Sequence, residues 1–290
     1  GIPYLISKRP DWDKFAGALY TIAFDLVMPD GRTLQVGTVH NLGQNFTKAF
    51  GFRIQRRDET FDYPWQTSYG VSDRVVAALA SAHGDDIGLV LPPEVAPVQV
   101  VVIPIPAKSP SDDERVREYA ERVRKDLEEG GIRARVDDKP DMTPGEKYYY
   151  WDAKGVPVRV EIGLREVKEG TVTIVRRDTL EKRVVKAVDL PGYVKTLFEE
   201  IYKGLYDRAW GFLRSMMSRH EDLEAARKAL EERGGVVEMP WCGSYDCAAR
   251  MAELLQAKTL GTPWPPEKAQ GRCPVCGRPA VAYLRLSRQY

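Results

Sequence analysis

The four cysteines of the chain are the residues whose spacing points most directly to a chemistry. They form two pairs, Cys242/Cys247 and Cys273/Cys276, with 25 residues between the pairs. Two short-spaced thiol pairs joined by a longer loop are typical of a structural zinc site. The alternatives are a redox CxxC motif or two disulfides. Both are less favoured because no cysteine lies elsewhere and cytoplasmic chains rarely keep disulfides. Four thiolates leave no open position on the ion, so we expect structural Zn²⁺.

A second group of polar residues lies in QVGTVHNLGQNF (35–46), between two apolar segments. On an alternating strand, Thr38 and His40 would point to the same face. A lone histidine is more often structural than functional, but this one lies near a glycine that admits close backbone approach. Its strand also precedes the turn that leads to Arg74, at the head of an apolar helix. A guanidinium at a helix N-terminus opposes the helix dipole unless it reaches an anion or stacks on a ring. The pattern therefore indicates a site for an anionic ligand.

The elements around these polar residues indicate a partly exposed antiparallel sheet. Segment 20–28 alternates in polarity and ends at the turn residues Pro-Asp-Gly (29–31). The helix that begins at Arg74 is expected to pack its apolar face on this sheet. An apolar strand is expected to follow it and to end at the proline pair 92–93.

The rest of the chain has a different character. VQVVVIPI (98–105) is a continuous apolar run, as expected of a strand buried on both faces. A helix over 111–129 and strands over 132–136, 156–163, 171–177 and 184–190 complete a predicted compact α/β domain. Helices are then expected over 193–219 and 220–233, ahead of the cysteines.

Composition limits the class of protein. The 290 residues carry 43 Lys and Arg against 42 Asp and Glu, so nucleic-acid binding would need a local basic patch. No apolar run is long enough to span a membrane, and no signal peptide opens the sequence. We therefore expect a cytoplasmic protein without membrane contact. The chain begins with Gly1 in mid-pattern rather than with methionine, which suggests a fragment.

Three segments together resemble a known family. They are GTVHNLGQNFTKAF (37–50), SYGVSDRVVAALASAHGDDIGLVLPPEVAPVQVVVIPI (68–105) and TPGEKYYYWDAKGVPVRVEIGLRE (143–166). They resemble prolyl-tRNA synthetase of the archaeal and eukaryotic type, a branch of the class II aminoacyl-tRNA synthetases. The four-cysteine tail and the terminal Tyr290 look like the C-terminal extension of the same family. The resemblance covers essentially the whole chain in order.

The resemblance implies a multidomain α/β and α+β protein. Residues 1–97 would be the last part of a class II antiparallel-sheet catalytic domain that carries the third signature motif. Residues 98–191 would be an α/β anticodon-binding domain, and residues 192–290 an α+β zinc-binding C-terminal domain. The activity implied is proline–tRNA ligation: proline is activated with ATP and Mg²⁺, and prolyl-adenylate then transfers the prolyl group to tRNA(Pro).

The resemblance also assigns residues to these steps. Gln35, Thr38, Ser72 and Arg74 match positions that contact ATP in the family, with Arg74 the catalytic residue, and His40 matches a position in the proline pocket. Such sites work mainly through orientation and charge stabilisation. The chain departs from the family at Val39, where serine is usual, and at Tyr69, where tryptophan is usual.

The first two class II motifs have no counterpart in the sequence. In the family the first builds the homodimer interface, and the second carries an arginine that holds the α-phosphate. Without that charge we expect the chain alone to be almost inert. The chain is thus expected to be the C-terminal portion of a longer, homodimeric enzyme.

For tRNA, the segment 159–186 is rich in basic residues interleaved with acids, and on charge alone it could equally be a solvated strand edge. The family places anticodon contacts in this domain. The candidates are Glu161, Arg165 and Arg176, because arginine can hold guanine bidentately and a carboxylate can accept from base amino groups.

Two other functions remain open. A freestanding tRNA-binding module that has lost catalysis would account for the anticodon domain and the tail, but it would not need Gln35, Thr38, His40 and Arg74. A zinc-stabilised interaction domain would leave segments 35–46 and 68–93 unexplained.

Overall fold

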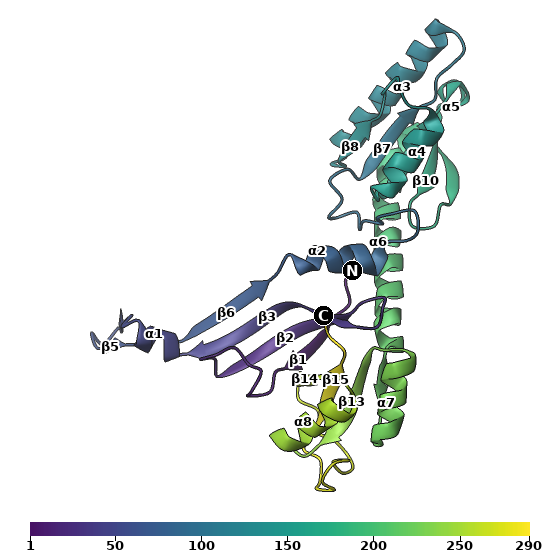
Figure 1. The fold of residues 1–290 in the computed structure, drawn as a ribbon. Coiled ribbons are helices and arrows are strands. Elements are labelled where there is room, and N and C mark those ends of the chain that lie inside the picture. Colours follow the sequence, from purple (N-terminus) through teal and green to yellow (C-terminus); the bar gives the residue numbers. More distant parts are fainter. The chain divides into compact units, whose positions relative to one another are not determined.

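The computed structural model describes all 290 residues and divides into two compact units. One unit comprises Gly1 and residues 79–209, and the other comprises residues 2–78 and 210–290. Helices α2 (Arg74–His83) and α6 (Leu190–Ser215) begin in one unit and end in the other. Each unit is built around its own sheet and its own hydrophobic core (Figure 1).

The unit of residues 79–209 contains a five-stranded sheet in the order β11-β10-β9-β7-β8. Strands β8 and β9 run parallel to β7, and β10 and β11 continue the sheet antiparallel. The strands are β7 (Val100–Pro104), β8 (Ala134–Val136), β9 (Val158–Ile162), β10 (Thr171–Arg176) and β11 (Lys182–Lys186). The helices are α3 (Pro110–Glu129), α4 (Pro144–Ala153) and α5 (Leu164–Glu169), with a 3-10 turn at Ala187–Asp189 before α6.

Helices cover both faces of this sheet. Val100 and Val102 pack with buried residues of α3 and α6, whereas Val101 and Ile103 pack with Trp151 of α4. Since successive strand residues point to opposite faces, the two sets of contacts lie on opposite sides of the sheet. The predicted burial of VQVVVIPI on both faces is therefore confirmed: all five residues of β7 are buried.

The other unit contains an eight-stranded sheet in the order β12-β13-β15-β14-β1-β2-β3-β6. All neighbours are antiparallel except β12 and β13. The strands are β1 (Leu5–Lys8), β2 (Tyr20–Val27), β3 (Thr33–Gly43), β6 (Gln66–Val71), β12 (Met217–Arg219), β13 (Val236–Trp241), β14 (Lys258–Pro263) and β15 (Ala282–Ser287). The unit also contains α1 (Asn45–Ala49), the small pair β4 (Ile54–Gln55) and β5 (Phe61–Asp62), α7 (Leu223–Glu232) and α8 (Tyr245–Leu254).

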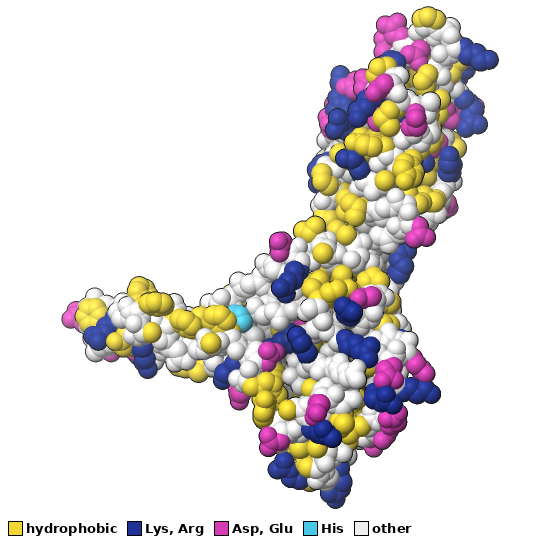
Figure 2. Space-filling view, viewed as in Figure 1, with side chains coloured by type: hydrophobic (Ala, Val, Ile, Leu, Met, Phe, Trp, Pro, Cys, Tyr) yellow, Lys and Arg dark blue, Asp and Glu magenta, His cyan; other side chains and the backbone are white.

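Packing in this sheet is uneven. Helices α7 and α8 share a core with β13 and β15, whereas five of the six residues of β6 are exposed. Figure 2 shows hydrophobic side chains exposed along β6 and α1. The junction of β14 with β1 requires glycine: Gly261 has a φ of +101°, and a Cβ there would lie 2.0 Å from the Lys8 carbonyl oxygen.

Several predicted elements are wrong or shifted. The apolar stretch before the proline pair 92–93 forms no strand; instead Leu89 N donates to Ala153 O, and Leu91 N donates to Gly155 O. The helix predicted over 193–219 ends at Ser215, because residues 217–219 pair with β13 as β12. The strand predicted over 184–190 is β11, which covers 182–186 and gives way to a helical turn.

Helix α2 also differs from expectation. Ala78 is buried in a cluster with Leu26, Met28 and Val36, but Val76 is 67% exposed. The apolar face of α2 is therefore only partly core. No helix is long and apolar enough to cross a membrane.

Candidate functional site

A bulge in β3 decides which polar side chains share a face of the sheet. Phe24 of β2 lies opposite Gly37, but the next residue, Asp25, lies opposite Gln35, so Val36 is an extra residue. Alternation alone would put Gln35 and Thr38 on opposite faces. The extra residue reverses that parity and puts Gln35 on the same face as Thr38.

Two buried charged residues, Arg9 and Asp25, form an ion pair next to Gln35. Arg9, which follows β1, is 4% exposed, and Asp25 is fully buried. The Arg9 Nη2 atom lies 2.7 Å from Asp25 Oδ1 and 2.7 Å from Gln35 Oε1, and Nη1 lies 2.7 Å from the Leu260 carbonyl oxygen. Burial raises the pKa of Asp25, while the charge of Arg9 acts in the opposite direction. The sequence analysis did not single out this pair.

His40 lies on the same face as Thr38. Its Nδ1 is 2.9 Å from the Thr21 hydroxyl oxygen, and its ring lies 4.8 Å from the Phe15 ring. Burial lowers the pKa of His40, which favours the neutral imidazole. A neutral ring that shares a hydrogen bond with Thr21 has one nitrogen left for a ligand.

Ser72 and Arg74 lie beside this part of β3, just before and at the start of α2. The Ser72 backbone N–H donates to the Val36 carbonyl oxygen at 3.0 Å, next to the bulge. Arg74 is exposed, and its Nη1 lies 3.4 Å from the Gln35 carbonyl oxygen. The residues predicted for one site, Gln35, Thr38, Ser72 and Arg74, thus lie close together where β3, the end of β6 and the start of α2 meet.

The four cysteines converge in the same unit. Their sulfur atoms all lie within 4.8 Å of one another, and the Cys242 and Cys276 sulfurs are 3.6 Å apart. Four thiolates at about 2.3 Å from a tetrahedral ion have sulfurs just under about 4 Å apart. The set therefore has the ligand number and the spacing that a metal ion requires.

An arginine lies beside these thiols. Arg278 Nε is 3.3 Å from the Cys276 sulfur, and Nη2 is 3.5 Å from the Cys242 sulfur. The hydrogen bond from Arg278 lowers the pKa of the Cys276 thiol to about 6, whereas burial raises that of Cys247 to about 12. A positive charge at the rim of a four-thiolate group would offset part of its negative charge.

The three predicted anticodon residues differ in how freely they can meet a ligand. The Arg165 side chain is 68% exposed and has one carboxylate partner, Glu166. Arg176 makes two hydrogen bonds to Asp178 and one to Glu200, and its side chain is 11% exposed. Glu161 accepts from the ammonium of Lys182 at 3.2 and 3.3 Å and from Arg159. Of the three, Arg165 is the least engaged within the protein.

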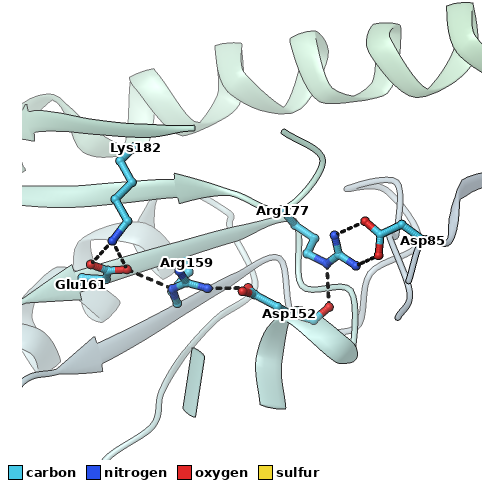
Figure 3. Close-up of polar contacts among 6 residues, drawn as sticks. All are labelled: Asp85, Asp152, Arg159, Glu161, Arg177 and Lys182. Carbon is cyan, nitrogen blue, oxygen red and sulfur yellow. Dashed lines mark hydrogen bonds and ion pairs between the residues drawn. The ribbon is translucent and has the colours of Figure 1, made fainter. Parts of the chain in front are cut away.

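Glu161 is part of a longer chain of charges (Figure 3). Arg159 pairs with both Glu161 and Asp152, and Arg177 donates to the Asp152 carbonyl oxygen at 2.7 Å. Two further bonds join the Arg177 guanidinium to the Asp85 carboxylate, at 2.6 and 2.7 Å. These bonds lower the pKa of Asp85 to about 2. The network links β9, α4, the end of β10 and the turn after α2.

Comparison with known proteins gives these features a context. Residues 99–197 match the family described as anticodon binding domain. Residues 223–290 match the family described as prolyl-tRNA synthetase, C-terminal. The five-stranded sheet, from β7 to β11, therefore lies within the part of the chain that matches an anticodon-binding domain.

Relatives similar over the whole chain identify the family. The chain is 57% identical to a proline–tRNA ligase of Aeropyrum pernix, and 51% identical to those of Metallosphaera sedula and Sulfolobus acidocaldarius. Each match covers 100% of this chain and 60% of the relative. The chain belongs to the prolyl-tRNA synthetase family, as predicted, and spans about 60% of the length of these curated relatives.

Proposed function

We propose that the chain functions as part of a proline–tRNA ligase, which activates proline with ATP and transfers it to tRNA(Pro). The observation that supports this most directly is the 57% identity over the whole chain to a relative with that name. The polar face of β3 supports the catalytic half of the proposal, and the anticodon-binding match supports the tRNA half. Homodimer formation by the whole enzyme remains an expectation from the family.

ATP, with its Mg²⁺, is proposed to lie against Gln35, Thr38, Ser72 and Arg74. Arg74 is exposed and makes only a long bond to a backbone oxygen, so its guanidinium has donors left for phosphate. Its role would be to hold ATP near the adenine and γ-phosphate, which orients the nucleotide for attack by the proline carboxylate. His40 would contact proline, with Thr21 fixing the direction of its ring.

tRNA is proposed to meet the unit of residues 79–209 through Glu161, Arg165 and Arg176. Arg165 needs the least rearrangement, because only Glu166 holds it. For Glu161, a base would have to share or displace the Lys182 ammonium. Unpaired anticodon bases are read through their edges by side chains of this type.

The four cysteines are proposed to hold zinc. When bound, the ion would supply folding free energy of order 10 kcal/mol rather than catalysis, because thiolates fill all four positions. The proposed division of labour is a catalytic part over 1–97, an anticodon-binding domain over 98–191 and a zinc-binding domain over 192–290.

Two binding measurements on the 290-residue chain test the proposal. Fluorescence anisotropy should show tighter binding of tRNA(Pro) than of the same tRNA with a replaced anticodon, and calorimetry should show binding of ATP. We expect no proline-dependent ATP–pyrophosphate exchange by this chain alone, because the family's α-phosphate arginine is not in its sequence. Binding of tRNA without any binding of ATP would instead favour a freestanding anticodon-binding module.

A further inference from the structure

Arg9 occupies an unusual place beside the proposed nucleotide site. It is 4% exposed, and its guanidinium donates to three oxygens, those of Asp25, Gln35 and Leu260. The Arg9 Nε atom also lies 3.9 Å from an Asp13 carboxylate oxygen. Because Arg9 is buried and both terminal nitrogens of its guanidinium donate within the protein, Arg9 is not available to a ligand. Any effect of Arg9 on a bound ligand must therefore act through a residue to which Arg9 is hydrogen-bonded.

Gln35 is the held residue that reaches the site. Arginine carries hydrogen-bond donors and no acceptor, so the end of the Gln35 amide that faces it must be the oxygen. The amide nitrogen, with its two N–H groups, then lies at the opposite end. Arg9 thereby fixes Gln35 as a donor toward the surface of β3, whereas a free amide could present either end.

The buried carboxylate of Asp25 completes this support. Asp25 Oδ1 accepts from Arg9, and Oδ2 has no hydrogen-bond partner although the side chain is fully buried. Asp25 is the carboxylate that is hydrogen-bonded to Arg9, at 2.7 Å, whereas Asp13 lies at 3.9 Å and its side chain is 55% exposed. The buried Asp25 therefore supplies the main charge that holds the guanidinium at this depth. An ion pair needed only for packing would not have to touch a residue on the polar face.

The groups around Gln35 are also donors. Arg74 donates to the Gln35 backbone oxygen at 3.4 Å, and the bulge at Val36 puts Gln35 on the same face of the sheet as Thr38. Donors that converge in this way fit a ligand rich in acceptor oxygens, such as the polyphosphate of ATP. We propose that Arg9, paired with Asp25, is a positioning residue that fixes the Gln35 amide so that its nitrogen donates to bound ATP. This inference rests on the proposed nucleotide site.

Nuclear magnetic resonance of the side-chain amide tests the positioning without ATP. The Gln35 NH₂ signal of the ¹⁵N-labelled 290-residue chain is assigned from its loss in Gln35→Met. We expect a restrained amide in the wild type and a mobile one in Arg9→Lys, because a single ammonium lacks the two-armed geometry of the guanidinium. Arg285→Lys is the matched control. Arg285 is 9% exposed and contacts Glu238 and Ser7 rather than Gln35.

A second variant controls for misfolding caused by a buried charge that has lost its partner. Arg9→Met combined with Asp25→Asn removes both charges together, so that neither is left buried without its partner. In this double variant the Gln35 amide should also become mobile while the backbone spectrum stays folded. A Gln35 amide that is equally restrained in all the Arg9 variants overturns the inference.

ATP titration tests the consequence. Gln35→Met should weaken ATP binding about tenfold in the wild-type background, and less than about twofold when Arg9 is already replaced. Equal losses in both backgrounds would show that Arg9 does not act through Gln35. If the wild type binds no ATP although its Gln35 amide is restrained, the proposed nucleotide site is wrong and the assigned ligand with it. A mobile Gln35 amide in the wild type overturns the role of Arg9 whatever ATP does.

Discussion

Strands β9 and β6 are both hydrogen-bonded into sheets, yet their surroundings are opposite. Every residue of β9 is buried, because helices cover both faces of its sheet. In β6 all residues but the first are exposed, with Tyr69 at 73% and Val71 at 78%. The anticodon-binding unit is therefore held by a self-contained apolar core. The proposed nucleotide site lies beside β6, where Ser72 and Arg74 are exposed and Gln35 is held by a polar contact from Arg9.

The largest effect is expected from the four-cysteine tail. It tests whether a loss of folding free energy stays within the part of the chain where the metal would bind. Chelation of the metal, or Cys273→Ser, should remove folding free energy of order 10 kcal/mol from the tail, because Cys273 is 1% exposed and belongs to its core. Hydrogen exchange should show loss of protection in β13 and β15 but not in β7 or β9. Elemental analysis of the purified chain should find about one zinc per chain.

A control for this experiment lies in the same loop. Ser244→Ala changes a residue between Cys242 and Cys247 without removing a thiol, and its side chain makes no capping hydrogen bond. It should leave both zinc content and exchange unchanged. Full protection of β13 in metal-free protein would contradict a structural role for the metal.

The same substitution in β9 and in β6 measures the difference between the strands directly. Val160→Ala removes two methyl groups from a fully buried position, whereas Val71→Ala removes them from a side chain that is 78% exposed. We expect a loss of about 2 to 3 kcal/mol of unfolding free energy for the first and less than about 0.5 kcal/mol for the second. Urea unfolding followed by circular dichroism gives both values. Similar losses would mean that β6 is covered in solution.

These contrasts also explain what the sequence could predict. Apolar patterns located β2, β7 and α3, and the buried residues of α3, Val116, Tyr119, Ala120, Val123 and Leu127, recur at helical spacing in the sequence. Cysteine spacing found the thiol cluster. Such features depend on residues close together in sequence, so a single chain suffices to predict them.

Features set by distant residues were missed. The short strand β12 exists because β13 pairs with it, and nothing in the helical pattern before it signals that partner. Arg9 and Asp25 are far from Gln35 in sequence and meet it only through the sheet register and the bulge at Val36. Residues 87–91 have the composition of a strand, but their backbone pairs irregularly with the end of α4.

A smaller effect concerns how burial of a histidine makes the stability of the protein depend on pH, and His83 and His40 differ in this respect. His83 is 3% exposed and neither ring nitrogen has a hydrogen-bond partner, whereas His40 bonds to Thr21. Burial, followed by the charges of the Gly1 amino group and Arg208, lowers the pKa of His83 to about 4. Below the unfolded-state value of about 6.5, the unfolded chain takes up a proton that the folded chain refuses. Stability must therefore fall as pH falls.

The size and control of this effect follow from the linkage. Between about pH 7.5 and about pH 5, His83 should lower the free energy of unfolding by about 2 kcal/mol, and the loss should continue to about pH 4. Urea titrations at both pH values should show this difference for the wild type and not for His83→Leu. In His220→Leu, which changes a partly exposed histidine bonded to Ser218, the pH dependence should persist. An unchanged pH dependence in His83→Leu would refute the assignment.

The smallest expected effect concerns the surface of the well-packed unit, where binding rather than folding should change. Arg165→Ala removes an exposed guanidinium held only by Glu166, so we expect the free energy of unfolding to change by less than about 0.5 kcal/mol. The affinity for tRNA(Pro) should fall about tenfold, equivalent to about 1.4 kcal/mol, if Arg165 contacts a base edge. Lys125→Ala on α3 removes the same charge from an exposed position and should weaken binding only slightly. Anisotropy at fixed salt separates the two, because a general charge effect would weaken binding equally in both variants. Equal losses would remove Arg165 from the proposed anticodon contacts and leave it as an exposed charge on α5.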